Sequence, residues 1–296
     1  MRISNQSQIM QTKRNVSSLQ GRIAEHQTNI ATGKRVRTMS DDPSAAAQAY
    51  KFNRQLRHLD QYSRNLDDAK SWLDLADQVS QTVDDRLIRA RNLILQSDSG
   101  VLGQDARSAI AQELRGIAEE VADSLNTTRA GHPIFGGTSS SDAPFDGNGV
   151  FSGNTKAVLR SVSDTVQLEV NIDGDMIAGA FDATTPADGN IMQVLHAVAA
   201  DIDNGLAANT HLARMDELQQ GVHSAQATIG AKQRAVEGHE ERIADTRLSV
   251  ETNRSEAVDV DITRELLELK ATEVSYQASI GVAARVLSAS VLDFLR

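Results

Sequence analysis

Apolar side chains recur every seven residues along much of this chain. The clearest series runs through the first third, and Ser80 is its only polar member. A companion series of mostly small residues sits three positions on, which is the a and d spacing of a coiled coil. The spacing predicts one long helix from Pro43 to about residue 98. The two series are Phe52, Leu59, Leu66, Leu73, Ser80, Leu87 and Ile94, and then Tyr62, Ala69, Ala76, Val83 and Ala90.

Further helices are predicted by the same spacing. A turn at 97–100 and a helix over about 104–129 should fold back on the first helix as an antiparallel hairpin. Helix is expected again near 190–206 and over about 210–257, and both chain termini also carry helical repeats. The repeats of these segments are Met215, Val222, Ile229, Val236, Ile243, Val250 and Ala257; Ile9, Val16, Ile23 and Ile30; and Ile262, Leu266, Leu269, Glu273, Tyr276, Ile280, Ala283, Leu287, Ser290 and Phe294.

Residues 131–189 have a different character, because glycine, Asp, Asn and Ser replace the heptads. The stretch from Phe145 to Phe151 is typical of a turn between short strands, and 166–172 alternates apolar and polar residues. Asp173-Gly174 then predicts a hairpin turn. The fold class expected is mainly α, a long antiparallel helical bundle with a small β-rich insert in the middle of the sequence.

Three domains follow from this organisation. Residues 1–42 with 258–296 should form a terminal helical coiled coil, and residues 43–130 with 190–257 a long helical bundle. Residues 131–189 should form a small outer insert. The terminal segments offer few aliphatic residues for the backbone they must order, so one hairpin of the two is marginal. We therefore expect residues 1–35 and 260–296 to be disordered or loosely helical in the monomer and to fold on assembly.

A charged corner lies between the first two helices. Gly33 can adopt the left-handed backbone that ends a helix. Asp42 can accept the free N–H groups of the next helix, and Pro43 suits its first position. Taken alone, this is the pattern of an ordinary helical corner. Asp261 is expected to cap the last helix in the same way.

Composition narrows the function classes. Only 3% of the residues are aromatic, and Trp72 is the single tryptophan. The core must therefore be packed with aliphatic side chains, which suits long helices. The net charge of −10 argues against a nucleic-acid binder. The absence of cysteine excludes disulfides, thiolate zinc sites and cysteine nucleophiles. The start of the sequence is polar and predicts no cleaved signal peptide, and no apolar run predicts membrane insertion.

No pattern of catalytic residues is present. None of the seven histidines belongs to a His-x-x-x-His or His-Glu-x-x-His motif, so solvated histidines are favoured over a metal site. The stretch 171–175 lacks the glycine and glutamate spacing of a calcium loop, and a hairpin turn is the favoured interpretation. No phosphate-binding loop or nucleophile elbow occurs. The prediction is a protein that is not an enzyme and uses no cofactor or metal.

The corner at 32–46 resembles the corner motif of the flagellin superfamily, whose members build the outer bacterial flagellum. Its matching residues are Gly33, Arg35, Asp41, Asp42 and Pro43. Similar stretches are found at 65–73, 131–137 and 291–296. Ser40-Asp41-Asp42-Pro43 and Trp72 are more similar to the hook–filament junction branch than to filament subunits, as is the stretch 283–288. His132-Pro133 departs from the glycine-aromatic pair usual in the superfamily, which leaves the local loop undefined.

The resemblance implies a role. Such proteins leave the cell through the flagellar export channel without a cleaved signal and assemble into a short ring at the end of the hook. The implied partners are other copies of the chain, the hook-side junction protein, flagellin, and an export chaperone on the C-terminal helix. The implied location is the extracellular flagellum, with the terminal apolar repeats as the assembly interface and the 52–94 repeat as the inner bundle core.

Two other interpretations stay open. A minor filament flagellin would form long polymers by itself, whereas a junction protein would not. A coiled-coil adaptor or signalling protein would fold and dimerise without ordering its termini on neighbouring subunits.

Overall fold

The computed structural model describes residues 2–98, 103–139 and 143–294, apart from the side chains of residues 2–6, 8–9 and 286–294. The chain divides into two compact units. The first holds Met1–His58 with Thr246–Arg296, and the second holds Leu59–Asp245. Two helices, α2 (Pro43–Ser97) and α6 (Leu212–Val258), contribute residues to both units.

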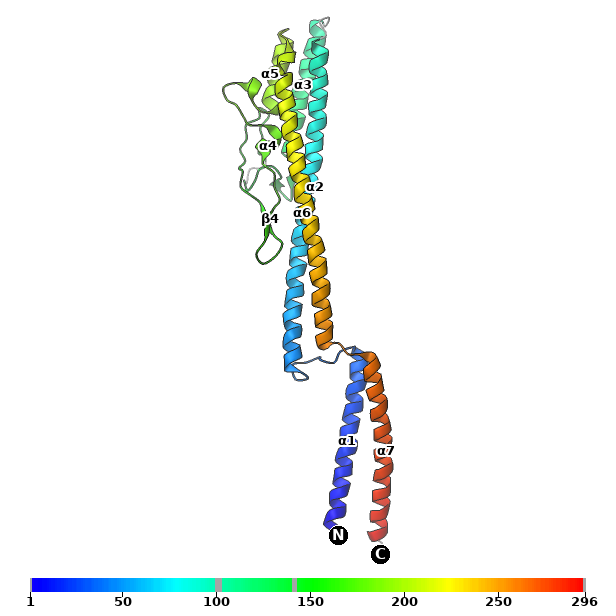
Figure 1. Ribbon diagram of the computed structural model, residues 1–296. Helices are drawn as coiled ribbons and strands as arrows, with labels where there is room; N and C mark the ends of the chain where they lie inside the picture. The colour runs from blue at the N-terminus through cyan, green and yellow to red at the C-terminus, as the bar shows by residue number, and fades with distance from the viewer. Residues whose placement is uncertain (1, 99–102, 140–142, 295–296) are drawn as a thin grey trace. The chain divides into compact units, whose positions relative to one another are not determined.

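The second unit is built on α2, α3 (Gln104–Leu125), α5 (Ile191–Asp203) and α6, which Figure 1 shows running alongside one another. The predicted heptad positions of α2 face this core: Leu66, Leu73 and Ile94 are fully buried. Buried Ser80 satisfies its hydroxyl by donating to the Ala76 carbonyl at 2.7 Å, so the one polar heptad position costs no unpaired group.

The predicted hairpin of α2 and α3 is present. Arg86 pairs with Glu120 at 2.9 Å, and Arg89 pairs with Glu113 at 2.6 Å. The residue number on α3 falls as the residue number on α2 rises, which shows that the two helices run antiparallel. These four side chains are exposed, so the pairs mark the alignment of the helices and add little stability.

The insert has little regular structure of its own. Strand β1 (Thr128–Arg129) pairs antiparallel with β2 (His132–Pro133), and β3 (Leu159–Ser161) pairs antiparallel with β4 (Gln167–Glu169). Two short helical turns follow in the insert, α4 (Gly174–Ala178) and η1 (Pro186–Asp188), and a third, η2 (Ala208–His211), lies between α5 and α6. Many apolar side chains of the insert, including Phe135 and Phe145, join the core of the four helices.

One of the two predicted turns of the insert is confirmed. Phe145 and Phe151 face each other across a bridge, their ring centroids lie 4.9 Å apart, and the Asp146 N–H donates to the Val150 carbonyl at 3.2 Å. This is the predicted turn between extended segments.

The other turn prediction is wrong. Asp173-Gly174 is not a hairpin turn: the hairpin of β3 and β4 turns before β4, where the Val162 N–H donates to the Val166 carbonyl at 3.0 Å. Asp173 instead precedes α4. Glycine is required at 174 because a Cβ there would lie 2.8 Å from the Phe145 ring, so the dipeptide reflects close packing and not turn chemistry.

The first unit contains α1 (Arg2–Thr32) and α7 (Ile262–Phe294), which pack side by side with both chain ends at the same end of the pair (Figure 1). It also holds the beginning of α2 and the end of α6. Asp261 caps α7 as predicted, because its carboxylate accepts the Arg264 N–H at 3.1 Å.

Candidate functional site: the helical corner and the terminal helix pair

Gly33 ends α1 as the sequence predicts. Its φ of +68° is left-handed, and its carbonyl accepts the Val260 N–H at 3.0 Å. The next residue, Lys34, forms an antiparallel bridge with Asp259. The end of α1 is therefore joined through the backbone to the segment that leads into α7.

Arg35 and Val36 continue this junction. Both backbone N–H groups donate to the Val258 carbonyl, at 2.8 and 3.2 Å, and the Arg35 guanidinium donates to the Ala257 carbonyl at 2.9 Å. Arg35 also lies 3.5 Å from the Asp42 carboxylate. Val36 and Val258 are buried with Ala45 in a small apolar cluster. One arginine thus holds the C-terminus of α6 and the N-terminus of α2 together.

Asp41 and Asp42 serve the backbone of the corner. Asp41 accepts the N–H groups of Thr38 and Arg37, at 2.9 and 3.0 Å, and these bonds lower the pKa of its carboxyl. Asp42 accepts from Ala45 and Ser44 at 3.0 Å each, and its pKa is lowered mainly by the Ala45 bond. Pro43 is the first residue of α2. The sequence predicted the roles of Asp42 and Pro43, whereas the loop-closing bonds of Asp41 needed the structure.

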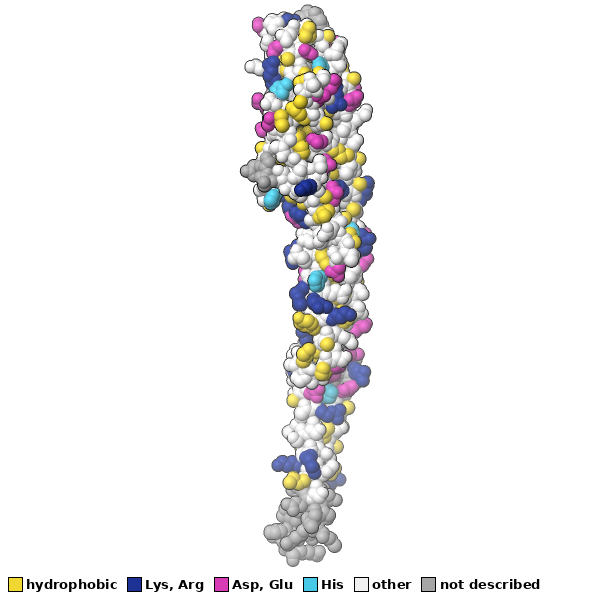
Figure 2. Space-filling view, turned by 90° about the vertical axis from the view of Figure 1, so that its left-hand side faces the viewer, with side chains coloured by type: hydrophobic (Ala, Val, Ile, Leu, Met, Phe, Trp, Pro, Cys, Tyr) yellow, Lys and Arg dark blue, Asp and Glu magenta, His cyan; other side chains and the backbone are white. Residues whose placement is uncertain are grey.

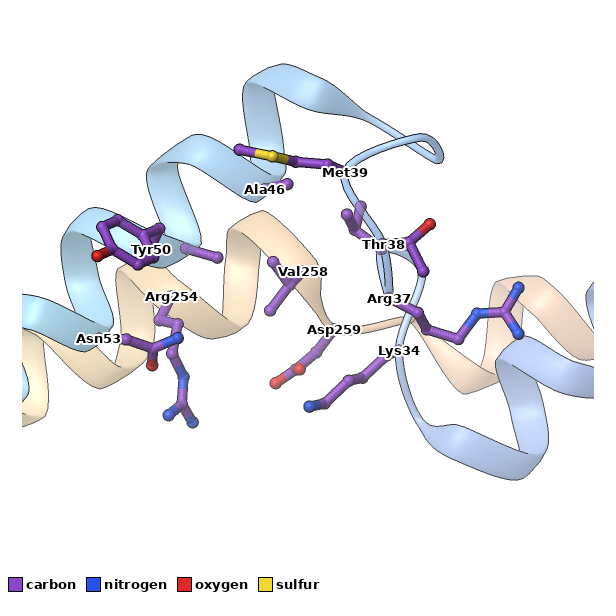
Figure 3. Close-up of a pocket in the computed structure, with 12 residues that line it drawn as sticks. Lys34, Arg37, Thr38, Met39, Ala46, Tyr50, Asn53, Arg254, Val258 and Asp259 are labelled. Atoms are coloured by element: carbon purple, nitrogen blue, oxygen red, sulfur yellow. The ribbon is translucent and has the colours of Figure 1, made fainter.

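A groove opens beside this corner, with a volume of about 320 Å³. Figure 3 shows Tyr50 and Asn53 on α2, Arg254 and Val258 on α6, and Lys34 on the connecting segment around it. The full lining is Lys34, Val36, Arg37, Thr38, Met39, Ala46, Ala49, Tyr50, Asn53, Arg254, Val258 and Asp259. The groove combines cations, one carboxylate and apolar walls, and it has no arrangement of nucleophile and base.

The seam between α1 and α7 is polar at its most buried positions. Among the described side chains of the two helices, His26, Asn29 and Thr272 are the buried ones. Glu265 accepts from Asn29 at 2.9 Å and bonds to His26 at 2.9 Å. Partial burial raises the pKa of the Glu265 carboxyl, but these two hydrogen bonds outweigh it and bring the pKa below its ordinary value.

The predicted apolar repeats of the terminal helices divide between the seam and the surface. Six of their members are half-buried at the seam: Val16, Ile23, Ile30, Leu269, Tyr276 and Ala283. The others with described side chains, Ile262, Leu266 and Ile280, are exposed. The side chains of Ile9, Leu287 and Phe294 lie outside the described residues.

Further apolar residues of α7 are exposed that the repeat did not include. Together with the three above they are between 44% and 69% exposed: Ile262, Leu266, Leu267, Val274, Ile280 and Val282. A straight helix advances 100° per residue. Counted in this way, the buried seam positions of α7 lie about 50° around the helix from the centre of the predicted apolar stripe. The seven-residue spacing of Leu267 and Val274 was present in the sequence and could have been used to find them.

Most of the inner heptad series is buried. Leu59, Leu66, Leu73, Leu87 and Ile94 are buried in the second unit. Phe52, in the first unit, is half-buried. Side chains of both charge signs are interspersed over the face in Figure 2, and no described helix is long and apolar enough to cross a bilayer.

Comparison with known proteins gives a consistent result. The chain matches the family model for the bacterial flagellin N-terminal helical region over residues 3–139 and that for the C-terminal helical region over residues 212–295. It is 25% identical to flagellar hook-associated protein 3 of Escherichia coli (strain K12), over 94% of this chain and 96% of the relative. It is 26% identical to a flagellin of Halalkalibacterium halodurans, over 90% of this chain and 89% of the relative.

Solved structures share the fold. Bacillus cereus FlgL superposes with a TM-score of 0.59 at 20% identity, covering 69% of this chain and 99% of that one. The flagellar junction protein FlgL of Legionella pneumophila gives a TM-score of 0.54 at 16% identity, covering 72% and all of that chain.

Proposed function

This chain belongs to the flagellin superfamily, and from that premise we propose that it is a structural subunit of the junction between the hook and the filament of a bacterial flagellum. The observation that carries the proposal is the match to hook-associated protein 3 over 94% of this chain and 96% of the relative. The solved FlgL structures support it, because their fold matches that of this chain.

A minor filament flagellin is the second candidate. One filament flagellin matches this chain at 26% identity, which is as high as the match to the hook-associated protein. Identity alone therefore does not separate the two roles. The Asp42-Pro43 corner and Trp72 favour the junction, since they resemble that branch.

We propose that the terminal helices assemble through the apolar residues that α7 leaves exposed. Leu267 and Val274 are 69% and 66% exposed, and they lie seven residues apart on one line of the helix. Burying a leucine or valine completely contributes about 1.5–3 kcal/mol. About two thirds of each side chain is still exposed, so covering both would contribute about 2–4 kcal/mol per subunit contact. Neighbouring copies are the proposed source of the cover.

The same exposed line supports two finer proposals. An export chaperone on α7 would keep the line covered before assembly, when it would otherwise self-associate. Copies of this chain would form a short ring, with the hook-side junction protein and flagellin as the neighbours at its two ends. Export through the flagellar channel to the cell exterior completes the proposal.

Deletion of the gene tests the junction role. The expected result is bare hooks by electron microscopy together with flagellin released into the culture medium, because filament subunits would lack a foundation. Filaments lost without released flagellin would assign the chain to the filament. Intact filaments with normal swimming would refute the junction role and leave at most a minor flagellin, or a role outside the flagellum.

The interface is tested by complementing the deletion strain. Leu267→Asp with Val274→Asp should abolish filament attachment while the level of soluble protein stays normal. The matched control is Leu159→Asp with Val166→Asp, which makes the same two kinds of change at residues of the insert that are 48% and 39% exposed. Attachment that survives the α7 changes, or is lost equally in the control, would contradict the proposed interface.

A further inference from the structure

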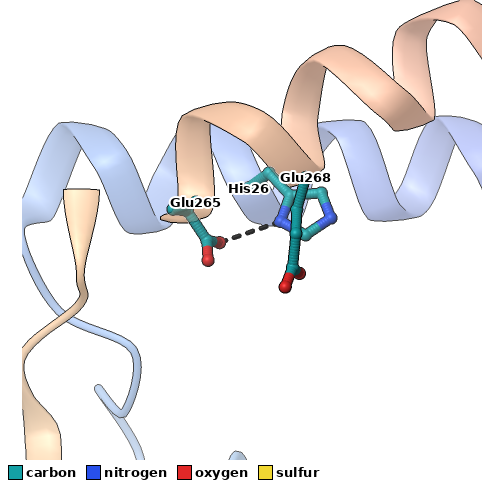
Figure 4. Close-up of side chains that lie close together, drawn as sticks. All are labelled: His26, Glu265 and Glu268. Atoms are coloured by element: carbon teal, nitrogen blue, oxygen red, sulfur yellow. Dashed lines mark hydrogen bonds and ion pairs between the residues drawn. The ribbon is translucent and has the colours of Figure 1, made fainter. Parts of the chain in front are cut away.

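Three side chains with metal-ligating groups meet across the terminal helix pair. His26 comes from α1, and Glu265 and Glu268 come from successive positions on one face of α7 (Figure 4). One candidate ligand atom from each lies within 4.8 Å of the other two. The His26 Nδ1 and the Glu265 Oε1 are already 2.9 Å apart.

Two buried polar atoms at this place have no hydrogen-bond partner in the part of the chain that the structure describes. They are the His26 Nε2 and the Asn29 Oδ1, and the two residues are only 9% and 5% exposed. The Asn29 amide also reaches the cluster, because its Nδ2 donates to the same Glu265 oxygen at 2.9 Å. Rotating that amide by half a turn exchanges its nitrogen and its oxygen, and brings a carbonyl oxygen to the cluster.

We propose that His26, Glu265 and Glu268 bind one divalent transition-metal ion of the Zn²⁺ class, with the Asn29 amide oxygen as an available fourth ligand. An imidazole with carboxylate oxygens is a donor set that Zn²⁺ accepts, with ligand atoms about 2.0–2.2 Å from the ion. Ligands at those distances lie about 3.3–3.6 Å from one another in a tetrahedral site. The His26 Nδ1 and the Glu265 Oε1, 2.9 Å apart, would have to separate by about half an ångström to admit the ion. Glu268 is exposed, so its side chain can turn to close the site.

The other histidines that pair with carboxylates offer a contrast. His211 bonds to Asp201 at 2.8 Å, and His223 lies 3.2 Å from Asp84. Neither pair has a third His, Asp or Glu ligand within reach among the described residues. His26 is thus distinguished by a two-carboxylate set that spans two helices.

A metal at this place would act on the pairing of α1 with α7. The ligands come from helices separated by more than two hundred residues of sequence, and the seam between them buries polar groups. Because an ion can be held by all three ligands only when the helices are paired, its binding free energy adds to the stability of the pair. At a free ion concentration of 100 times Kd, opening of the pair should become about 100-fold less frequent.

The test uses the full chain after treatment with a chelator. Titration with Zn²⁺ by calorimetry, and with Co²⁺ by visible absorption, should give one ion per chain with the spectrum of a four-coordinate N/O site. Amide exchange followed by mass spectrometry should slow in the peptides around His26 and Glu265 when the ion is added. No binding, or no change in exchange at these peptides, would overturn the proposal.

Variants assign the ligands. His26→Gln should lower the affinity at least tenfold, and Glu268→Gln should lower it as well. Glu268→Gln is the decisive variant, because the ion pair that it removes among the described residues is with the largely exposed Arg264, and folding should be unaffected. His223→Gln is the matched control and should bind normally. The site would be refuted if the His26 and Glu268 variants bound the ion as tightly as the unchanged chain. It would also be refuted if the His223 control lost binding.

Discussion

Gly33 and Gly21 allow one substitution to test how the corner is built. Both lie on or at the end of α1, and a Cβ added to either would have no heavy atom within 4 Å. They differ in backbone conformation, since Gly33 has a φ of +68° and Gly21 lies within the helix. The same change to alanine should therefore have opposite effects at the two positions.

The magnitudes follow from the two conformations. An L-residue in the left-handed region costs about 1–2 kcal/mol, and alanine recovers about 0.4–1 kcal/mol by restricting the unfolded chain. Gly33→Ala should thus destabilise the end of α1 by about 1 kcal/mol. Gly21→Ala should stabilise the helix by about 0.8–1.0 kcal/mol, because alanine is the better helix former. The difference of about 2 kcal/mol corresponds to a factor of roughly 30 in local opening.

Amide exchange of the full chain is the assay, read in the peptides of α1 and in the segments 33–37 and 257–262. Gly33→Ala should expose the N–H groups of Arg35, Val36 and Val260, whose acceptors depend on this turn. Gly21→Ala should slow exchange in α1 and leave the corner unchanged. If both variants shift exchange in the same direction, the left-handed turn is not what joins α1 to the α6–α7 segment.

Three further changes test other parts of the structure. Leu73→Ala should lower the free energy of unfolding by about 2–5 kcal/mol, because Leu73 is fully buried. The control Leu248→Ala, at a 66% exposed position, should lower it by less than about 0.5 kcal/mol, and urea midpoints measure both. The pKa of the Glu265 carboxyl is lowered in the folded chain, so its stabilisation of the terminal helix pair is complete above the ordinary pKa of 4.5. That stabilisation is lost as the pH falls through the lowered pKa. Circular dichroism should therefore show a loss of helix on acidification, and Glu265→Gln should reduce this loss. Asp68→Asn should destabilise the insert by about 1–2 kcal/mol, because partly exposed Asp68 pairs with both Arg129 and Arg160; amide exchange over 128–161 would measure it.

The long helices could be predicted closely because their signal is local. Pro43 fixes the start of α2, the absence of proline after it permits an unbroken helix, and the heptad from Leu59 to Ile94 identifies the buried face. The corner was also readable, since Gly33 and Asp42 perform functions that few other residues can. In both cases the residue type determines the structure without reference to distant parts of the chain.

The insert and the face of α7 could not be read in this way. Gly174 is required by the Phe145 ring, which lies about thirty residues away in sequence, and no local pattern distinguishes that need from a turn. The seam of α7 follows Glu265 because two polar residues of α1 bond to it. Apolar periodicity describes a helix face by hydrophobicity alone, so the repeat runs through half-buried Leu269 and exposed Leu266 and Ile280 without separating the seam from the surface.

This polar seam bears on how the subunit could remain soluble and still assemble. A helix pair that buried its own aliphatic residues would gain little from neighbours. Here the most buried described side chains of the pair are His26, Asn29 and Thr272, while Leu267 and Val274 face outward. Polar contacts align α1 with α7 but contribute modest net stability, and the larger apolar contribution is available only when another molecule covers α7. The monomer should accordingly show weak amide protection in both helices, and assembly should raise it most along the line of Leu267 and Val274.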